Sequence, residues 1–306
     1  MKLRIATCRP IPKFDTDEAP LLAALAARGI DATLGAWHDE RVGWEEPGAT
    51  VIRSTWNYIH HLDAFLDWAA RASTAGPFWN PLSIVRWNIH KRYLLELGAR
   101  GVATTPTTLF ERGAIVDLGA EVDAHGWNEF VLKPAVGAGS FGTRRFARSE
   151  LADARAHLAS LLPTRDMLLQ PYLSSVDGYG ERALVWLDGE FTHAIRKTPR
   201  WSGQKENVST ALAIEPDERA LGEAALAPIA SILAGSSRMA SSSGLAGAPR
   251  SAQPPELLYA RVDVARDASN RPVLMELELI EPSLFLAQHP PALARFVESL
   301  ARRLAD

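Results

Sequence analysis

One short run of residues near the C-terminus constrains the fold more than any other part of the chain. Between Leu274 and Ile280, Glu276 and Glu278 alternate with apolar residues. Because side chains alternate across a strand, both carboxylates lie on one face, and the other face carries only apolar side chains. The run therefore predicts a strand that buries one face in a core and directs two acids toward a shared site.

A second run with the same alternation precedes it. Arg261 and Asp263 share one face of a predicted strand, and a polar turn at residues 269–270 follows. If the two runs pair as an antiparallel hairpin that closes on this turn, Asp263 lies opposite Glu276 and Arg261 lies opposite Glu278. Three carboxylates then gather on one small patch of the sheet.

Acids that face each other destabilise a sheet, and a divalent cation relieves the conflict. Carboxylate oxygens on rigid strands suit Mg²⁺, which also keeps substrate phosphates in its coordination shell. Asp263, Glu276 and Glu278 are therefore the predicted metal ligands. The alternative is an ordinary solvated sheet face, which we disfavour because such a face more often mixes lysine, threonine and glutamate.

The composition limits the classes of function. The chain has 306 residues, 47% of them apolar, which suffices for two or three packed units. Its 36 acids and 33 bases occur without long blocks of one sign, so we expect no nucleic-acid partner. Cys8 is the single cysteine, which excludes an internal disulfide and a multi-cysteine zinc site. With neither a signal peptide nor a membrane-spanning run in the sequence, we expect a cytoplasmic location and no membrane partner.

The order of predicted elements divides the chain into three units. Residues 1–85 alternate strands with helices, which predicts a small parallel α/β domain. Its expected elements are strands at 3–8, 31–37 and 50–56 and helices at 18–27 and 62–72. Residues 86–165 form a second unit, with a helix at 88–97 capped by Asn88, a strand pair at 107–110 and 130–133, and a helix at 149–162.

Residues 166–306 form the third unit. We expect antiparallel strands at 167–171, 182–187 and 191–196, with Asp188-Gly189 as the hairpin turn between the last two. A helix at 216–233 precedes the acidic hairpin, and a helix at 291–304 closes the chain. Residues 234–255 are mostly Ser, Ala, Gly and Pro, a composition that predicts a flexible insert.

A glycine-rich segment supplies a candidate phosphate site. Lys133 ends a predicted strand, and Gly137 to Thr143 contains three glycines whose backbone amides can approach an anion. The spacing matches neither the P-loop nor the dinucleotide fingerprint, and alone it is more often a simple turn. Lys91, Lys133 and the distant acidic hairpin strengthen it, because cations for phosphates and acids for a metal together indicate a Mg-nucleotide site.

The order of these motifs resembles that of the ATP-grasp ligases, in the branch similar to prokaryotic glutathione synthetase. The resemblance covers about residues 85–300 and rests on six motifs in order, at residues 88–91, 131–134 with the glycine loop, 169–173, 180–185, 263 and 276–278. The first 85 residues look like the small domain that precedes the grasp in this family. The implied fold class is α/β, with an α+β grasp. It is an ATP-grasp fold that follows a small N-terminal parallel α/β domain.

The resemblance also implies roles for single residues. Contacts to ATP are implied for Lys91, Lys133, Gly137, Gly139, Ser140, Gly142, Gln170, Pro171, Tyr172, Leu173 and Glu181, with residues 170–173 as the adenine hinge. Arg182 and Arg196, on strands that we expect to face the cleft, and Arg261 would neutralise the transferred phosphoryl group or hold substrate. Asp263, Glu276 and Glu278 would hold Mg²⁺, with Mn²⁺ as an alternative, although the family usually has Asn at the position of Glu278.

The implied reaction activates a carboxyl group with ATP to an acyl phosphate, which a nitrogen then attacks to give an amide, ADP and phosphate. Small-molecule carboxylate and amine substrates are implied, and homo-oligomers are common in the branch. Within the branch, residues 53–58 and 278–285 most resemble those of cyclo-ligases acting on O-ureido-D-serine. This resemblance favours antibiotic biosynthesis from an amino-acid-like precursor.

Several alternatives stay open at the level of sequence. Trp56 and Tyr58 either line the acceptor site or merely pack between domains. Glu281 follows the acidic strand and is not assigned as a metal ligand. Two other functions are possible instead of a ligase. The chain could be an ATP-binding accessory protein that does not ligate, which the unusual Glu278 and the insert would favour. It could also be a small-molecule kinase of the same fold.

Overall fold

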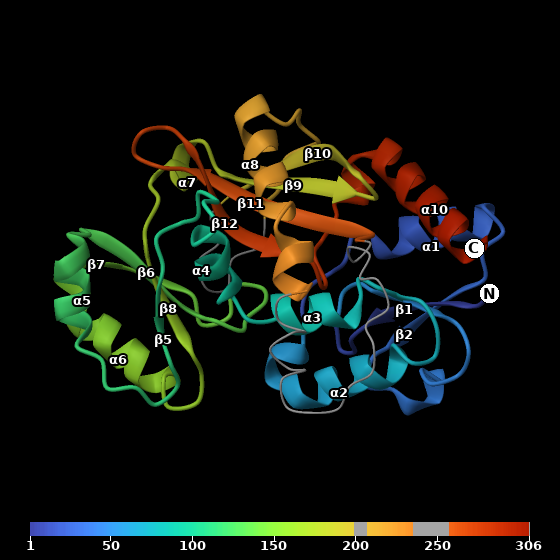
Figure 1. Ribbon diagram of the computed structural model, residues 1–306, viewed down its shortest axis with the longest axis horizontal. Helices are drawn as coiled ribbons and strands as arrows, with labels where there is room; N and C mark the ends of the chain where they lie inside the picture. Colours follow the sequence, from blue (N-terminus) through green and yellow to red (C-terminus); the bar gives the residue numbers. More distant parts are fainter. Residues whose placement is uncertain (199–206, 235–256, 306) are drawn as a thin grey trace.

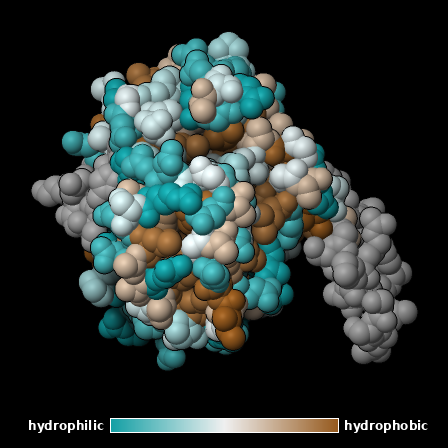
Figure 2. All heavy atoms as spheres, turned by 90° about the vertical axis from the view of Figure 1, so that its left-hand side faces the viewer, coloured by the Kyte–Doolittle hydropathy of each residue, from teal (hydrophilic) through white to brown (hydrophobic). Residues whose placement is uncertain are grey.

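The computed structural model describes residues 1–198, 207–234 and 257–305, which form three four-stranded sheets (Figure 1). The predicted insert at 234–255 lies, apart from its first residue, outside these described residues. Figure 2 views the molecule from the side of the central sheet, where polar residues and small apolar patches share the surface. No helix among the described residues combines the length and the apolar character that crossing a membrane requires.

The N-terminal sheet is parallel, as its alternation of strands and helices predicted. Its strands run in the order β2 (Ala32–Ala36), β1 (Leu3–Thr7), β3 (Ala49–Ile52), β4 (Phe78–Trp79), with helices α1 (Glu18–Ala27) and α2 (Leu62–Ala72) packed on it. The third strand ends at Ile52 and not at residue 56, because the apolar run stops there. The chain then leaves the sheet, and Arg53 becomes a buried anchor that donates to Pro282 O at 2.9 Å.

The central sheet is antiparallel throughout. Its order is β5 (Thr108–Phe110), β8 (Met167–Pro171), β6 (Glu129–Pro134), β7 (Arg144–Ala147), with α5 (Leu118–His125) and α6 (Leu151–Leu161) over one face. The sequence analysis paired β5 with β6 directly and assigned β8 to the third unit; both expectations were wrong, because β8 inserts between those two strands. Short α5 and β7 were not predicted.

The C-terminal sheet carries the acidic hairpin at one edge. Its order is β10 (Glu190–Lys197), β9 (Glu181–Leu187), β11 (Tyr259–Arg266), β12 (Pro272–Glu278), again antiparallel. Helices α8 (Pro216–Leu226), α7 (Ser175–Gly178) and α10 (Pro290–Ala305) pack around it, and short 3-10 helices lie at Glu40–Val42, Tyr58–His60, Arg148–Glu150 and Leu286–Gln288.

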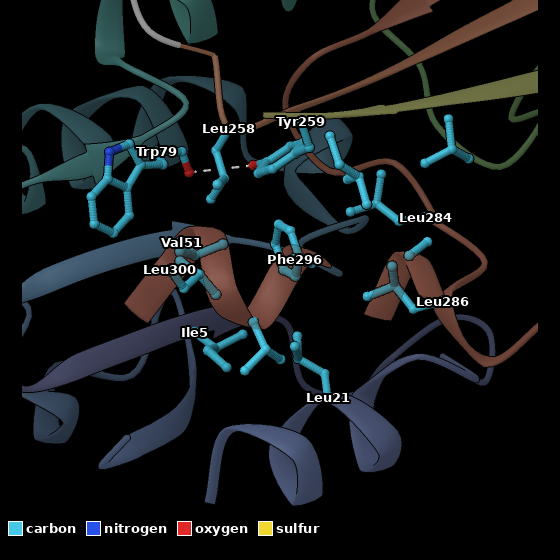
Figure 3. Packing of buried hydrophobic residues seen from close by; sticks show 14 of the residues in the cluster. Ile5, Leu21, Val51, Trp79, Leu258, Tyr259, Leu284, Leu286, Phe296 and Leu300 are labelled. Atoms are coloured by element: carbon cyan, nitrogen blue, oxygen red, sulfur yellow. Dashed lines mark hydrogen bonds between the residues drawn. The ribbon is translucent and has the colours of Figure 1, made fainter. Parts of the chain in front are cut away.

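One apolar core joins the N-terminal unit to this sheet. Ile5 and Val51 of the parallel sheet point toward Phe296 and Leu300 of α10, and Tyr259 of β11 lies on the opposite side of the helix (Figure 3). The Tyr259 hydroxyl also bonds to backbone oxygens of three other segments, at Ile52, Trp79 and Ile280. Shared burial of this kind fixes the position of the acidic hairpin relative to the first unit.

The predicted register of the acidic hairpin is confirmed: Asp263 pairs with Glu276, and Arg261 pairs with Glu278. The turn is one residue longer than predicted and spans residues 268–270, since Asp267 N–H bonds to Arg271 O at 2.9 Å. A bulge between Asp263 and Val264, which leaves Met275 as the extra residue of β12, restores the register of the acidic pairs.

The free edge of β12 is satisfied by side chains. Asn88 donates to Leu277 O and accepts from Leu279 N–H, both at 2.9 Å, and Leu277 N–H donates to the Tyr93 hydroxyl at 3.0 Å. The predicted helix at 88–97 is therefore two helices, α3 (Leu82–Asn88) and α4 (Tyr93–Gly98). Asn88 is not an N-cap, because its amide serves β12, and Lys91 lies in the turn between the two helices.

Candidate active site

A cavity of about 240 Å³ lies where the three sheets meet. The N-terminal unit contributes Trp56 and Tyr58, the central sheet contributes Lys133, and the C-terminal sheet contributes Asp263 and Glu276. Most of the residues that the sequence analysis assigned to the site line this cavity: Lys91, Lys133, Gly137, Gly139, Ser140, Gln170, Pro171, Tyr172, Leu173, Glu181, Arg261, Asp263, Glu276 and Glu278. Cations, glycines and acids from distant parts of the chain thus share one space.

Two of the arginines predicted to be catalytic lie elsewhere. Arg182 is buried and donates to Ala213 O at 2.6 Å, while Arg196 is exposed and donates to Gly178 O at 2.9 Å. The two residues are cross-strand partners, so they share a face of the sheet, and that face is not the one that borders the cavity. Assigning Arg182 and Arg196 to the cleft was therefore wrong, because on each strand the adjacent residue faces the cavity.

Their neighbours occupy the cavity face instead. Glu181 and Lys197 are also cross-strand partners, and both line the cavity. Lys197 contacts the Glu181 carboxylate and donates to Asp263 Oδ2 at 2.7 Å. Lys197 was missed by the sequence analysis, because the hairpin at Asp188 alone would pair Glu181 with Arg196. The register shift between Phe191 and His193, which local sequence does not indicate, brings Lys197 opposite Glu181 instead.

Because adjacent residues of β10 face opposite sides, they provide a matched test. We expect Lys197→Met to lower ATP-dependent turnover about 10- to 100-fold, since Lys197 holds a carboxylate of the site. Arg196→Ala should stay within about twofold of the wild type, because Arg196 lies outside the cavity. Initial rates of ADP release measure both, and equal losses in the two variants would contradict this assignment of faces.

The acidic hairpin is neutralised by basic side chains of the chain itself. Asp263 accepts from Arg261 through both oxygens, at 2.8 Å each, and Arg261 also donates to Glu278. Glu276 accepts from Lys133 at 2.7 Å, with Lys91 Nζ at 3.9 Å. The conflict between like charges that the sequence predicted is thus resolved by cations, and Arg261 compensates the charge that Glu278 adds relative to the Asn usual in the family.

These contacts set the protonation of the acids. Burial raises the pKa of Glu276, but Lys133 and Lys91 outweigh it and bring the pKa down to about 2. Burial likewise opposes ionisation of Asp263, yet Arg261 and Lys197 hold its pKa well below the ordinary value. Burial dominates at the other two acids, so the pKa of Glu181 rises to about 7 and that of Glu278 is also raised.

The donor set suits a hard cation such as Mg²⁺, which prefers carboxylate oxygens. Asp263, Glu276 and Glu278 lie on adjacent strands and border one cavity. Across the described residues, however, no three His, Cys, Asp or Glu side chains are grouped closely enough to hold a metal. The chemistry of the residues fits the ion, but Lys and Arg nitrogens now bond to the oxygens that it would use.

The glycine loop borders the cavity and is anchored at its end. Lys91 Nζ donates to Gly137 O at 2.9 Å, and Ser140 adopts a left-handed backbone with φ 62°. Gly142 does not line the cavity, contrary to the prediction. It is required for the turn instead, because its φ is 63° and a Cβ there would lie 3.0 Å from the Pro134 side chain.

The tip of the loop reaches the N-terminal unit. The ring of Phe141 lies edge-on to that of His60, with 5.1 Å between centroids. Arg165 lies over the same ring at 4.9 Å and donates to Ile59 O at 3.2 Å. These contacts tie the glycine loop and the central sheet to the first unit.

The segment predicted as the adenine hinge lies at the end of β8. Gln170 donates to Thr107 Oγ1 at 2.8 Å, and Tyr172 N–H bonds to Glu129 O at 3.0 Å. Apolar side chains of Val131, Val176 and Met275 line the cavity along with this segment. Apolar side chains beside the end of β8 suit the flat ring of a nucleotide base.

Trp56 and Tyr58 fit both interpretations left open by the sequence, lining of the site and packing between domains. Both side chains line the cavity, and both contact Glu281 of the C-terminal unit: the Tyr58 hydroxyl bonds to its side chain, and Trp56 Nε1 donates to Glu281 O at 2.9 Å. The Tyr58 ring also stacks on Phe65 within the N-terminal unit. Glu281 also lines the cavity, next to Tyr58. The sequence analysis left Glu281 without a role, because its position just beyond the strand gives no indication of where the side chain points.

Comparisons with known proteins agree with this arrangement. Residues 3–80 match a family described as D-cycloserine synthetase DcsG, N-terminal domain. Cycloserine biosynthesis protein DcsG of Streptomyces lavendulae is 36% identical over 304 residues, covering 95% of each chain. A crystal structure of D-cycloserine synthetase DcsG aligns with a TM-score of 0.86 at 33% identity, covering 99% of this chain and 100% of the other. The ATP-grasp ligase PsnB, in complex with a minimal precursor, Mg and ADP, aligns with a TM-score of 0.58 at 15% identity, covering 98% of both chains.

Proposed function

Because the chain belongs to the DcsG family of ATP-grasp ligases, we propose that it closes a ring within one amino-acid-like substrate of the O-ureido-D-serine type. The chain has the ATP-grasp fold and is an ATP-dependent ligase that forms C–N bonds. The ring-closing part of the proposal rests on the 36% identity to cycloserine biosynthesis protein DcsG over 95% of the chain. The observation that carries the phosphoryl transfer is the contact of Lys133 with Glu276, which joins the phosphate-binding side of the cavity to its acidic side. This is where a phosphoryl group would pass from ATP to a carboxylate.

The proposed reaction has two steps. A carboxylate oxygen of the substrate attacks the γ-phosphorus of ATP, the bond to ADP breaks, and an acyl phosphate forms. A nitrogen of the same molecule then attacks the carbonyl carbon, the C–N bond forms, and phosphate leaves with the electron pair of the C–O bond. The nitrogen gives up its proton in this step, and the departing phosphate is the base that takes it. Neither step requires a nucleophile from the protein, so positioning and charge stabilisation are the main contributions of the chain.

The residues of the cavity suit these contributions. Lys91 and Lys133 present ammonium groups beside the glycine loop, where phosphate oxygens would lie. Asp263, Glu276 and Glu278 would hold Mg²⁺, which when bound neutralises phosphate oxygens. The contact of Phe141 with His60 brings the glycine loop against the N-terminal unit, and a loop held there over bound substrate would shield an acyl phosphate from water.

The proposal is tested by the release of ADP from Mg-ATP in the presence of either enantiomer of O-ureido-serine, with mass spectrometry of the product. Release with a single ureido substrate and a ring-closed product is the expected result. Release that needs a separate acid and amine would replace it with an intermolecular ligase, and a phosphorylated hydroxyl would replace it with a kinase. ATP binding without release under any substrate pool would favour the accessory protein.

A further inference from the structure

Glu281 is a carboxyl group of the cavity that has no part in the mechanism above. Glu281 is 9% exposed, lines the cavity and follows Glu278 after two residues. Its backbone is held by Trp56, whose Nε1 donates to Glu281 O at 2.9 Å. Its side chain bonds to the hydroxyl of Tyr58, which belongs to a 3-10 helix of the N-terminal unit. Two aromatic residues thus fix this acid in the cavity wall.

Glu281 differs from the other acids of the cavity in its charge environment. Glu181, Asp263, Glu276 and Glu278 each form an ion pair with a lysine or an arginine. Among the residues that the structure describes, no basic side chain forms an ion pair with Glu281. Burial and the charge of Glu278 raise the pKa of Glu281 to about 8, and the Tyr58 hydroxyl, Lys91 and Arg261 oppose this rise without cancelling it.

A buried carboxylate without a cationic partner is unfavourable in a folded protein. The same group in a cavity wall becomes favourable when a ligand brings the missing positive charge, because the ligand cation and the carboxylate then compensate each other. A neutral ligand group would gain no such benefit. The substrate class of the proposed function carries one cation, its α-ammonium group.

We propose that Glu281 binds the ammonium group of the substrate, with the Tyr58 hydroxyl orienting the carboxylate, and that it makes the site selective for substrates with a free amino group. This inference rests on the proposed function for the identity of the substrate. It places the amino end of the substrate at the wall formed by Trp56, Tyr58 and Glu281. The reacting carboxylate then points toward Lys133 and Glu276.

The test compares O-ureido-serine with its desamino analogue, in which hydrogen replaces the ammonium group, in the wild type and in Glu281→Gln. For the amino substrate we expect Glu281→Gln to lower kcat/KM about 10- to 100-fold, mainly through KM, the range expected for losing one hydrogen bond to a charged group. Turnover of the desamino analogue and the KM for ATP should change by less than about threefold. Glu281→Asp should recover part of the preference, and exposed Glu111→Gln is the matched control.

Other outcomes would overturn the inference. Equal losses of kcat with both substrates would make Glu281 a proton-transferring group, and an equal rise in the Mg²⁺ requirement with both would make it a metal ligand. If the wild type releases no ADP with any substrate, the proposed function fails, and calorimetric binding of the two compounds still decides the role of Glu281. A preference for the amino compound that Glu281→Gln removes would then support the inference, and the absence of such a preference would refute it.

Discussion

Replacing Glu276 with glutamine is expected to lower the turnover number about 100- to 1,000-fold, the range seen when one charge-stabilising group is removed from an active site. Glutamine keeps the shape of the side chain but loses the charge that a divalent cation and Lys133 both require. Lys133 also lies beside the glycine loop, so the substitution disturbs the acidic and the phosphate-binding sides of the cavity together.

The fold should survive this change. The side chain of Glu276 is 24% exposed toward the cavity, so water can solvate Lys133 when the partner charge is lost. Rates of ADP release at saturating substrate measure the effect on turnover, and far-UV circular dichroism with a urea titration measures folding. A variant that is folded yet retains more than a tenth of the wild-type rate would refute the assignment of Glu276 to the metal.

The acidic hairpin shows why part of the site was predictable. Alternation along β11 and β12 determines which residues share a face, and the turn determines the register, so both acidic pairs followed from local sequence. The turn is one residue longer than predicted, and the bulge at Met275 compensates for this extra residue. The prediction was therefore correct at the acids although one of its premises was not.

Tertiary contacts explain the residues that were misplaced or missed. Arg182 and Arg196 were expected in the cleft because arginine suits phosphate, but only the approach of the central sheet determines which face of β9 and β10 borders a cavity. Asn88 looked like a helix cap because the edge strand that uses its amide is 189 residues away in the chain. Glu281 gains its significance only from burial beside Tyr58 and from the lack of an ion pair in the described structure.

Asp263→Asn is the second substitution with a large expected effect, here on stability as well as on activity. Asp263 is 1% exposed and accepts from both Arg261 and Lys197. Asparagine would leave two buried cations undercompensated, which typically lowers the free energy of unfolding by about 3–5 kcal/mol. Glu278 and Glu181 limit the loss, because removing the charge of Asp263 lowers their raised pKa values and lets them ionise more readily.

The pH dependence of this loss is fixed by the sign of the pKa shift. The pKa of Asp263 is lower in the folded state than in the unfolded chain. Its ionised form therefore stabilises the fold fully at pH values above the unfolded pKa of about 4. This contribution is lost as the pH falls from there toward the folded pKa. The difference in unfolding free energy between wild type and Asp263→Asn should therefore be largest near pH 7 and shrink on acidification toward pH 3. Urea titrations in EDTA at several pH values measure it, with exposed Asp67→Asn as the control. A difference that stays constant or grows on acidification would mean that Asp263 is not held ionised by Arg261 and Lys197.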